Sequence, residues 1–204
     1  VLGAWVQVDG AHRVLDIGTG TCLLALMLAQ RAPQARINAV EINEAAAGQA
    51  AENVAASPWA DRVRVHRMDV RKLRASEPYD LIICNPPYYP GDMPASTEVS
   101  SIAKHSAELR FEDLALVVDQ LLSSNGRAAF ILPANREEEF RRIAFGAGLH
   151  PRRRGALNYL EDRPAKRVLV EFARENVIPV LDPVTVEHAP GNYTQQYREL
   201  LAPF

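Results

Sequence analysis

Four consecutive residues, Asn85-Pro86-Pro87-Tyr88, carry groups that could act on a planar, conjugated amine. Such an amine is a poor nucleophile, because its lone pair is delocalised into the neighbouring ring or carbonyl. The Asn85 side-chain oxygen and the Pro86 carbonyl could each accept one N–H, which would direct the lone pair toward an electrophile. Tyr88 could stack on the ring, while the rigid Pro-Pro pair holds the carbonyl in place. These four residues are the catalytic candidates, and the chemistry needs no strong general base.

A glycine turn, Asp16-Ile17-Gly18-Thr19-Gly20, lies earlier in the chain and lets the backbone approach a ligand closely. A dinucleotide fingerprint would need a third glycine where this chain has Leu23, and it would bring a pyrophosphate next to Asp16. That carboxylate repels a phosphate but attracts the sulfonium and ammonium groups of S-adenosylmethionine. The sign of the charge therefore favours S-adenosylmethionine as the cofactor. The candidate contacts in the turn are Asp16, Gly18, Thr19 and Gly20.

Two further acidic residues follow predicted strands. Glu41, followed by Ile42, could accept hydrogen bonds from both ribose hydroxyls of a cofactor. Asp69 could accept from the adenine amine while Val70 lies against the ring. Alternatively, Glu41 caps the next helix and Asp69 is a solvated loop residue. A cofactor site is favoured because each of the two residues follows its own predicted strand. The candidates beyond the turn are Glu41, Ile42, Asp69, Val70 and Asn85.

The elements that must position these residues alternate between strands and helices. Apolar runs predict strands at 13–17, 36–41, 63–66, 79–84 and 127–132. Helices are predicted at 23–30, 43–56, 111–122 and 137–147, with Asn43 as an N-cap. A strand pair at 150–156 and 167–173 resembles a hairpin, and the tail from 184 allows one more strand and a short helix. The order predicts an α/β fold with a doubly wound, mostly parallel, seven-stranded sheet that ends in an antiparallel hairpin, all in one domain over 1–204.

Composition limits the possible partners. The 48% hydrophobic content suffices for a full core, and a net charge of -2 argues against coating nucleic acid through bulk charge. The two cysteines, Cys22 and Cys84, fall in predicted core segments, so we expect neither a disulfide nor a metal site. No apolar run approaches the roughly 18 residues of a membrane span, and no signal peptide opens the chain. We therefore expect a cytoplasmic protein without a membrane partner.

A basic cluster near the predicted hairpin is the candidate contact surface for a nucleic acid. Its members are Arg152, Arg153, Arg154, Arg163, Lys166 and Arg167, and Tyr89 beside the catalytic candidates adds a stacking face. An amine in an RNA loop is more accessible than one inside a duplex, which must be flipped out. A solvated charged edge that blocks strand pairing explains the three consecutive arginines equally well.

This succession of motifs resembles the class I S-adenosylmethionine-dependent methyltransferases over nearly the whole chain. It departs from them at Cys22, where the family usually carries a third glycine. The segments at 15–21, 23–31, 50–60, 85–89 and 192–194 are similar to those of bacterial tRNA1(Val) adenine-37 N6-methyltransferases. The resemblance implies methyl transfer to N6 of the adenine beside the anticodon, with the tRNA anticodon loop as partner. It also implies a missing N-terminal extension.

Three alternatives share parts of this pattern. Glutamine methyltransferases of release factors use the same tetrapeptide, but they usually carry a helical N-terminal domain for which little chain precedes residue 13. Guanine-N2 RNA methyltransferases often have Phe in place of Tyr88. A non-catalytic cofactor-binding or RNA-binding module is disfavoured by the intact Asn85 and Tyr88. The sequence does not give the oligomeric state, and we expect a monomer.

Overall fold

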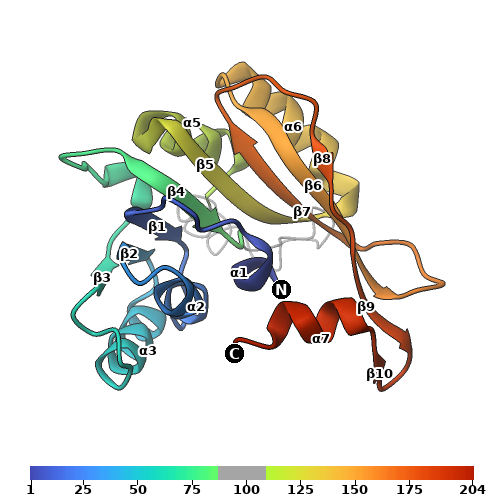
Figure 1. Ribbon diagram of the computed structural model, residues 1–204. Coiled ribbons are helices and arrows are strands. Elements are labelled where there is room, and N and C mark those ends of the chain that lie inside the picture. Colours follow the sequence, from blue (N-terminus) through green and yellow to red (C-terminus); the bar gives the residue numbers. More distant parts are fainter. Residues whose placement is uncertain (87–108) are drawn as a thin grey trace, which may run out of the picture.

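The computed structural model describes residues 1–86 and 109–204, so the predicted roles of Pro87, Tyr88 and Tyr89 concern residues outside the described part. In that part, ten strands form one twisted sheet with the order β10-β9-β6-β7-β5-β4-β1-β2-β3, and β8 pairs with β6 (Figure 1). The strands are β1 (Arg13–Ile17), β2 (Arg36–Glu41), β3 (Val63–Arg67), β4 (Tyr79–Cys84), β5 (Leu122–Pro133), β6 (His150–Leu160), β7 (Arg167–Ala173), β8 (Val180–Leu181), β9 (Val184–Ala189) and β10 (Asn192–Tyr193).

The sheet has a parallel part and a mixed part. Strands β3, β2, β1, β4 and β5 run parallel, whereas β7 lies antiparallel between β5 and β6. The doubly wound α/β fold and the antiparallel hairpin are confirmed. The predicted strand count of seven is wrong, because β8, β9 and β10 add to the edge. Two of these have only two residues each, which is too short for an alternating pattern to be visible in a sequence.

Helices cover both faces of the sheet. They are α1 (Leu2–Trp5), α2 (Leu23–Arg31), α3 (Glu44–Ala55), α5 (Phe111–Leu121), α6 (Glu137–Gly146) and α7 (Gln195–Leu201), with 3₁₀ turns η1 (Val70–Lys72) and η2 (Ala134–Arg136). The four predicted helices are confirmed to within one residue at each end. Asn43 is the N-cap of α3, as predicted, because its side chain accepts a hydrogen bond from the Ala46 N–H at 3.0 Å. Helix α1 was not predicted.

The hydrophobic core forms two layers, one on each face of the sheet. Helices α1, α2, α3 and α7 cover one face, which we call the α1 face, and α5 and α6 cover the other, the α5 face (Figure 1). Along β4, Leu81 and Ile83 belong to the layer on the α1 face, and Ile82 and Cys84 to the layer on the α5 face. Because strand side chains alternate, the next residue, Asn85, is directed to the α1 face.

Strand β6 anchors the beginning of the chain. The Arg153 guanidinium lies over the Trp5 ring, 4.0 Å from its centroid, and its Nη1 donates to the Trp5 carbonyl at 2.7 Å. The same arginine forms an ion pair with Asp182. Gly155 lies two residues after Arg153 on β6. A Cβ added to Gly155 would lie 2.2 Å from the Asp182 carbonyl oxygen. The segment before β9 therefore crosses directly over Gly155, and this close approach requires a residue without a side chain.

Substitution of Gly155 by Ala should lower the free energy of unfolding by about 2 kcal/mol or more, since the obstructing atom belongs to the backbone. The matched control is Gly48→Ala in α3, where an added Cβ meets nothing within 4 Å. The control should raise stability by about 0.5–1 kcal/mol, the usual gain from replacing an exposed helical glycine. Urea denaturation of both variants measures the effects. A Gly155→Ala protein as stable as the wild type would contradict the crossing.

Candidate active site

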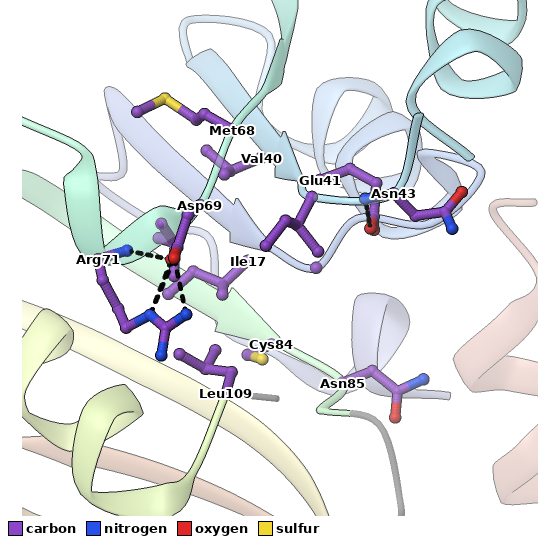
Figure 2. A pocket seen from close by; sticks show the side chains of 13 residues that line it. Ile17, Val40, Glu41, Asn43, Met68, Asp69, Arg71, Cys84, Asn85 and Leu109 are labelled. Carbon is purple, nitrogen blue, oxygen red and sulfur yellow. Dashed lines mark hydrogen bonds and ion pairs between the residues drawn. The ribbon is translucent and has the colours of Figure 1, made fainter. Parts of the chain in front are cut away.

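A pocket of about 400 Å³ opens at the carboxyl ends of the parallel strands (Figure 2). Its volume lies within the range of about 300–1,000 Å³ that is typical of small-molecule sites. The lining residues are Ile17, Gly18, Val40, Glu41, Ile42, Asn43, Met68, Asp69, Val70, Arg71, Cys84, Asn85 and Leu109. The pocket thus brings together six predicted cofactor contacts. Sequence reasoning missed the apolar wall formed by Met68 and Leu109.

The predicted residues follow one another along the sheet edge. Strand register pairs Ile17 with Cys84 on one side and with Val40 on the other. The residues that follow these positions therefore lie at one level of the edge: Gly18 after β1, Asn85 after β4 and Glu41 at the end of β2. Asp69 follows β3, the next strand outward. From β4 to β3 the edge spans three strand spacings, roughly 14 Å, which an elongated cofactor can bridge.

Backbone hydrogen bonds clamp the glycine turn onto β2. The N–H groups of Gly18 and Thr19 donate to the Val40 carbonyl at 2.9 and 3.1 Å, and the Gly20 N–H donates to Glu41 Oε2 at 2.9 Å. Gly18 and Gly20 have φ angles of 66° and 57°, in the left-handed region that favours glycine. The turn therefore has a fixed conformation, with Gly18 in the pocket wall and Thr19 and Gly20 beside it.

Glu41 combines two of the roles considered above. Its Oε1 accepts from the Asn43 N–H and its Oε2 from the Gly20 N–H, both at 2.9 Å, so the side chain holds the turn and the start of α3 together. It also lines the pocket. Each carboxylate oxygen has two lone pairs, so both can still accept a hydrogen bond from a ligand hydroxyl. The capping and ligand-binding roles are therefore compatible.

Asp16 lies beneath the turn and is completely buried. Its Oδ2 accepts from the Thr19 hydroxyl at 2.5 Å, and its Oδ1 has no hydrogen-bond partner among the described residues. Burial raises the pKa of Asp16 to about 6; the Thr19 hydroxyl and the Ala25 amide lower it, and Glu41 raises it. Leu15 and Ile17 belong to the α5-face layer, so Asp16 points to the α1 face, as does Asn85.

Asp69 is held by an arginine that sequence reasoning did not consider. Arg71 Nε donates to both carboxylate oxygens at 3.0 Å, Nη2 donates to Oδ2 at 2.7 Å, and the Arg71 backbone N–H donates to Oδ1 at 3.0 Å (Figure 2). The Arg71 side chain holds the pKa of Asp69 below its ordinary value. Asp69 thus remains an ionised acceptor in the pocket wall, beside the buried Val70.

The reacting end of the pocket is formed where β4 ends. Asn85 is exposed and lines the pocket, whereas Pro86 is buried. Figure 2 shows the Asn85 side chain directed away from Cys84 and Leu109, in agreement with the alternation along β4. Asp16 pairs in register with Ile83, two residues before Asn85. A buried carboxylate and an exposed amide therefore lie diagonally on adjacent strands and on the same face of the sheet.

Cys22 replaces the third glycine and keeps a glycine-like backbone. Its φ of 72° makes it the one residue other than glycine with a positive φ in the described part of the chain. The left-handed conformation costs an ordinary residue about 1 kcal/mol, which explains a preference for glycine at this position. The Cys22 side chain is fully buried, and burial raises the pKa of the thiol to about 11, so it is neutral at physiological pH.

The structure divides the predicted basic cluster into two groups. Arg152, Arg153 and Arg154 form ion pairs with Glu175, Asp182 and Glu137, respectively. Their charges are therefore largely balanced within the protein. The second group surrounds the turn of the β6–β7 hairpin, where Arg163 and Lys166 are exposed and Arg167 begins β7. RNA binding by either group stays a prediction. The second group is the better candidate, because Arg163 and Lys166 are exposed.

The described residues lack what a membrane span and a metal site require. No helix in the described ranges is long and apolar enough to cross a membrane. Among the same residues, no group of three or more His, Cys, Asp or Glu side chains is arranged to hold a metal ion. The described pocket lining therefore consists of carboxylates, backbone amides, the Asn43 and Asn85 side chains, the Arg71 guanidinium and apolar groups.

The fold is that of the class I S-adenosylmethionine-dependent methyltransferases. A predicted O-methyltransferase from Agrobacterium tumefaciens has the same fold, with a TM-score of 0.71 and 22% identity over 99% of this chain and 94% of that one. A TehB-like SAM-dependent methyltransferase from Corynebacterium glutamicum matches with a TM-score of 0.55 and 15% identity, over 80% of each chain. At these identities the likeness concerns the fold alone.

Sequence similarity is more specific. Residues 2–124 match the methyltransferase small domain family. The tRNA1(Val) (adenine(37)-N6)-methyltransferase of Bacteroides thetaiotaomicron is 39% identical over 98% of this chain and 85% of its own length. The protein of the same name from Aeromonas hydrophila is 39% identical over 100% of this chain and 86% of its own length. The chain therefore belongs to the tRNA1(Val) (adenine(37)-N6)-methyltransferase family, which confirms the resemblance noted from its motifs.

Replacing Asp16 by Asn should change the pH dependence of stability. The pKa of Asp16 rises from 3.8 to about 6 on folding, so the folded protein binds this proton more tightly than the unfolded chain. The stabilising contribution of Asp16 is thus complete below pH 3.8 and lost as the pH rises through about 6. Relative to the wild type, Asp16→Asn should gain up to about 3 kcal/mol between pH 4 and 7.

Urea denaturation without cofactor at several pH values measures this difference. Burial also raises the pKa of Glu171, but that carboxyl is present in both proteins and its effect cancels. A difference in unfolding free energy that stays constant from pH 4 to 7 would show that Asp16 does not titrate in this window.

Proposed function

We propose that this protein transfers the methyl group of S-adenosylmethionine to the exocyclic N6 amine of adenine 37 in a tRNA of the tRNA1(Val) type. The observation that carries the proposal is the position of Asn85. It lies at the pocket edge, level with Gly18 and Glu41 and on the same face as Asp16. Relatives named for this reaction match the chain over nearly its whole length, which supports the choice of substrate.

The order of side chains along the edge supports one orientation of the cofactor. Asp69 would accept from the adenine amine, and Val70 would lie against the ring. Glu41, already fixed by two backbone N–H groups, would accept the ribose hydroxyls. The glycine turn would face the methionine part. In this orientation the adenine would lie at β3 and the sulfonium at β1, next to Asn85.

The buried carboxylate explains how the site favours a cation. Asp16 Oδ1 has no hydrogen-bond partner in the described part of the chain, so ionising Asp16 without a ligand leaves a charge poorly compensated. A positively charged group nearby would stabilise the ionised form and lower the pKa of Asp16 again. The same carboxylate would disfavour an anionic pyrophosphate. The protein thus selects its cofactor through the charge it keeps beneath the turn.

Asn85 and Pro86 would activate the substrate amine by position rather than by proton abstraction. The Asn85 side-chain oxygen and the Pro86 carbonyl would each accept one N–H of the amine. Its lone pair would then be directed toward the bound cofactor, which supplies an electrophilic methyl group. Tyr88 would stack on the base. The methylated amine is acidic enough to lose its proton afterwards without a strong general base.

An anticodon loop suits this site better than a duplex. A base in a loop is already unpaired, so the enzyme does not have to break a base pair to reach it. The exposed Arg163 and Lys166 on the β6–β7 hairpin would contact the phosphate backbone. A tRNA substrate implies that the protein acts in the cytoplasm. No interface in the proposal requires a second copy, so a monomer suffices.

Product analysis tests the function directly. We expect the purified protein, given radiolabelled S-adenosylmethionine and unmodified tRNA, to label the tRNA. Nuclease digestion should yield N6-methyladenosine, and a transcript with guanine in place of adenine 37 should remain unlabelled. Release factor and a tRNA lacking the anticodon arm serve as competing substrates. Label on the release factor instead, or as N2-methylguanosine, would identify one of the rival activities.

The Asn85→Ala variant should lose turnover by about 100-fold or more while its affinity for S-adenosylmethionine stays close to that of the wild type. The reason is that Asn85 acts mainly on the amine in the transition state. Asn125→Ala, an exposed change at the start of β5 on the opposite edge, is the matched control. Single-turnover methylation and calorimetric titration with the cofactor separate the two effects. An equal loss of cofactor binding would make Asn85 a structural residue.

A further inference from the structure

Three tyrosines gather near the C-terminal end of the chain, and the site described above does not use them. Tyr193 and Tyr197 stack, with ring centroids 5.4 Å apart and an interplanar angle of 28°. Tyr159 on β6 is close enough to raise the pKa of Tyr197, after burial and Tyr193. Tyr159 and Tyr193 are 50% and 46% exposed, whereas Tyr197 is partly buried against the α1-face layer. We call these three residues the tyrosine cluster.

The fold holds this cluster rigidly. Thr194, between the stacked residues, is buried, and its backbone N–H donates to the Val186 carbonyl at 2.9 Å. Its hydroxyl donates to the Thr185 carbonyl at 2.5 Å and accepts from the Tyr197 N–H at 3.0 Å, which caps α7. Gln196 adds a hydrogen bond to the Pro183 carbonyl at 2.7 Å. The Tyr193 ring is therefore preorganised, with one side on Tyr197 and the rest open to solvent.

Strand register places the cluster at the same edge of the sheet as Asn85. Strand β6 runs parallel to β5, and the register across β7 aligns Arg154 with Cys84, the last residue of β4. Tyr159, five residues beyond Arg154, thus extends past the edge at which Asn85 lies. Tyr193 pairs with Glu187, which pairs with Leu160, so it lies at the same level.

The cluster also lies on the same face as Asn85. A Cβ added to Gly155 would meet Trp5, and Leu157 belongs to the α1-face layer, so the alternation along β6 directs Tyr159 to that face. Asn85 is directed to it as well. Three strand spacings separate β4 from β6 across the sheet, and five separate β4 from β10, roughly 14 and 24 Å. A loop that delivers one base to Asn85 would therefore carry its neighbouring nucleotides toward the tyrosines.

We propose that the tyrosine cluster is a stacking platform for an unpaired base of the substrate RNA, in the same loop as the base that is methylated. The proposal rests on the function proposed above. Stacking suits this surface better than charge attraction, because the exposed Arg163 and Lys166 of the hairpin are accompanied by the acidic Glu161 and Asp162. Aromatic faces accept bases of any type, and RNA-binding domains use them for unpaired nucleotides.

A binding experiment with paired variants tests this platform. The full chain, saturated with S-adenosylhomocysteine, is titrated into a fluorescently labelled anticodon stem-loop. Tyr193→Ala should weaken binding about 5- to 100-fold, the usual effect of losing one base–aromatic stack, whereas Tyr193→Phe should stay within about twofold. Phe145→Ala, which removes a 65%-exposed aromatic on α6, is the matched control and should bind like the wild type. Tyr159→Ala provides a second variant in the cluster.

A change in the RNA, combined with Tyr193→Ala, makes a double-mutant cycle. Removing the base, but not the sugar and phosphate, at one of the other unpaired positions of the loop should weaken binding to the wild type and have little further effect on Tyr193→Ala. The salt dependence of binding should be the same for Tyr193→Ala and the wild type, because stacking releases no counterions. Cofactor affinity and melting temperature show that each variant is folded.

The outcomes separate the two proposals. Wild-type methylation of adenine 37 combined with unchanged RNA binding by Tyr193→Ala and Tyr159→Ala would overturn the platform and leave the function intact. If Tyr193→Phe weakened RNA binding as much as Tyr193→Ala, the contact would be made by the hydroxyl and not by stacking. If Phe145→Ala weakened it as much, the effect would be nonspecific. Either result would overturn the platform. A wild-type protein that neither binds nor methylates tRNA would overturn both proposals.

Discussion

The site depends on the clamp that joins the glycine turn to the end of β2. Three successive N–H groups, from Gly18, Thr19 and Gly20, donate to the Val40 carbonyl and to Glu41. These bonds use main-chain donors that would otherwise lack partners, and they fix the level at which β1 and β2 end. The position of Asn85 follows from the register of β4 with β1. One set of short-range hydrogen bonds thus determines the spacing between cofactor and substrate groups.

The clamp also keeps a carboxylate where it is energetically unfavourable. Asp16 is wholly buried, and one of its oxygens lacks a partner in the described part of the chain. Such burial lowers the stability of the protein near neutral pH, because the folded state then holds a poorly solvated charge. A positively charged ligand offsets this cost when it binds. In the proposed function, the site would thus lose some stability but gain selectivity toward a cation, a balance that is common where function requires a strained or desolvated group.

Local patterns in the sequence were enough to predict helices α2, α3, α5 and α6, the first seven strands and six of the residues that line the pocket. These features depend on periodicity, turn residues and strand order, all of which act over short distances. The partners of the charged groups could not be predicted in this way. Arg152 and Arg153 bind acids 23 and 29 positions away, across strands whose pairing was unknown, so their balanced charges could not be inferred. Asp69 and Arg71 are near neighbours, but no pattern distinguished their pair from two solvated side chains.

In the proposed function, substrate choice depends on residues outside the pocket. Every residue that lines the pocket falls within residues 2–124, the part that matches the methyltransferase small domain family. In the proposed mechanism, Asn85 and Pro86 orient an amine, but these two groups would not distinguish adenine from guanine or glutamine. The later residues build β6, β7, β9, β10 and α7, which extend the sheet beside the site and carry the hairpin cations and the tyrosine cluster. In the proposed function, a general transfer site and a separate recognition surface would share one continuous sheet, so substrate recognition could vary without disturbing the geometry of methyl transfer.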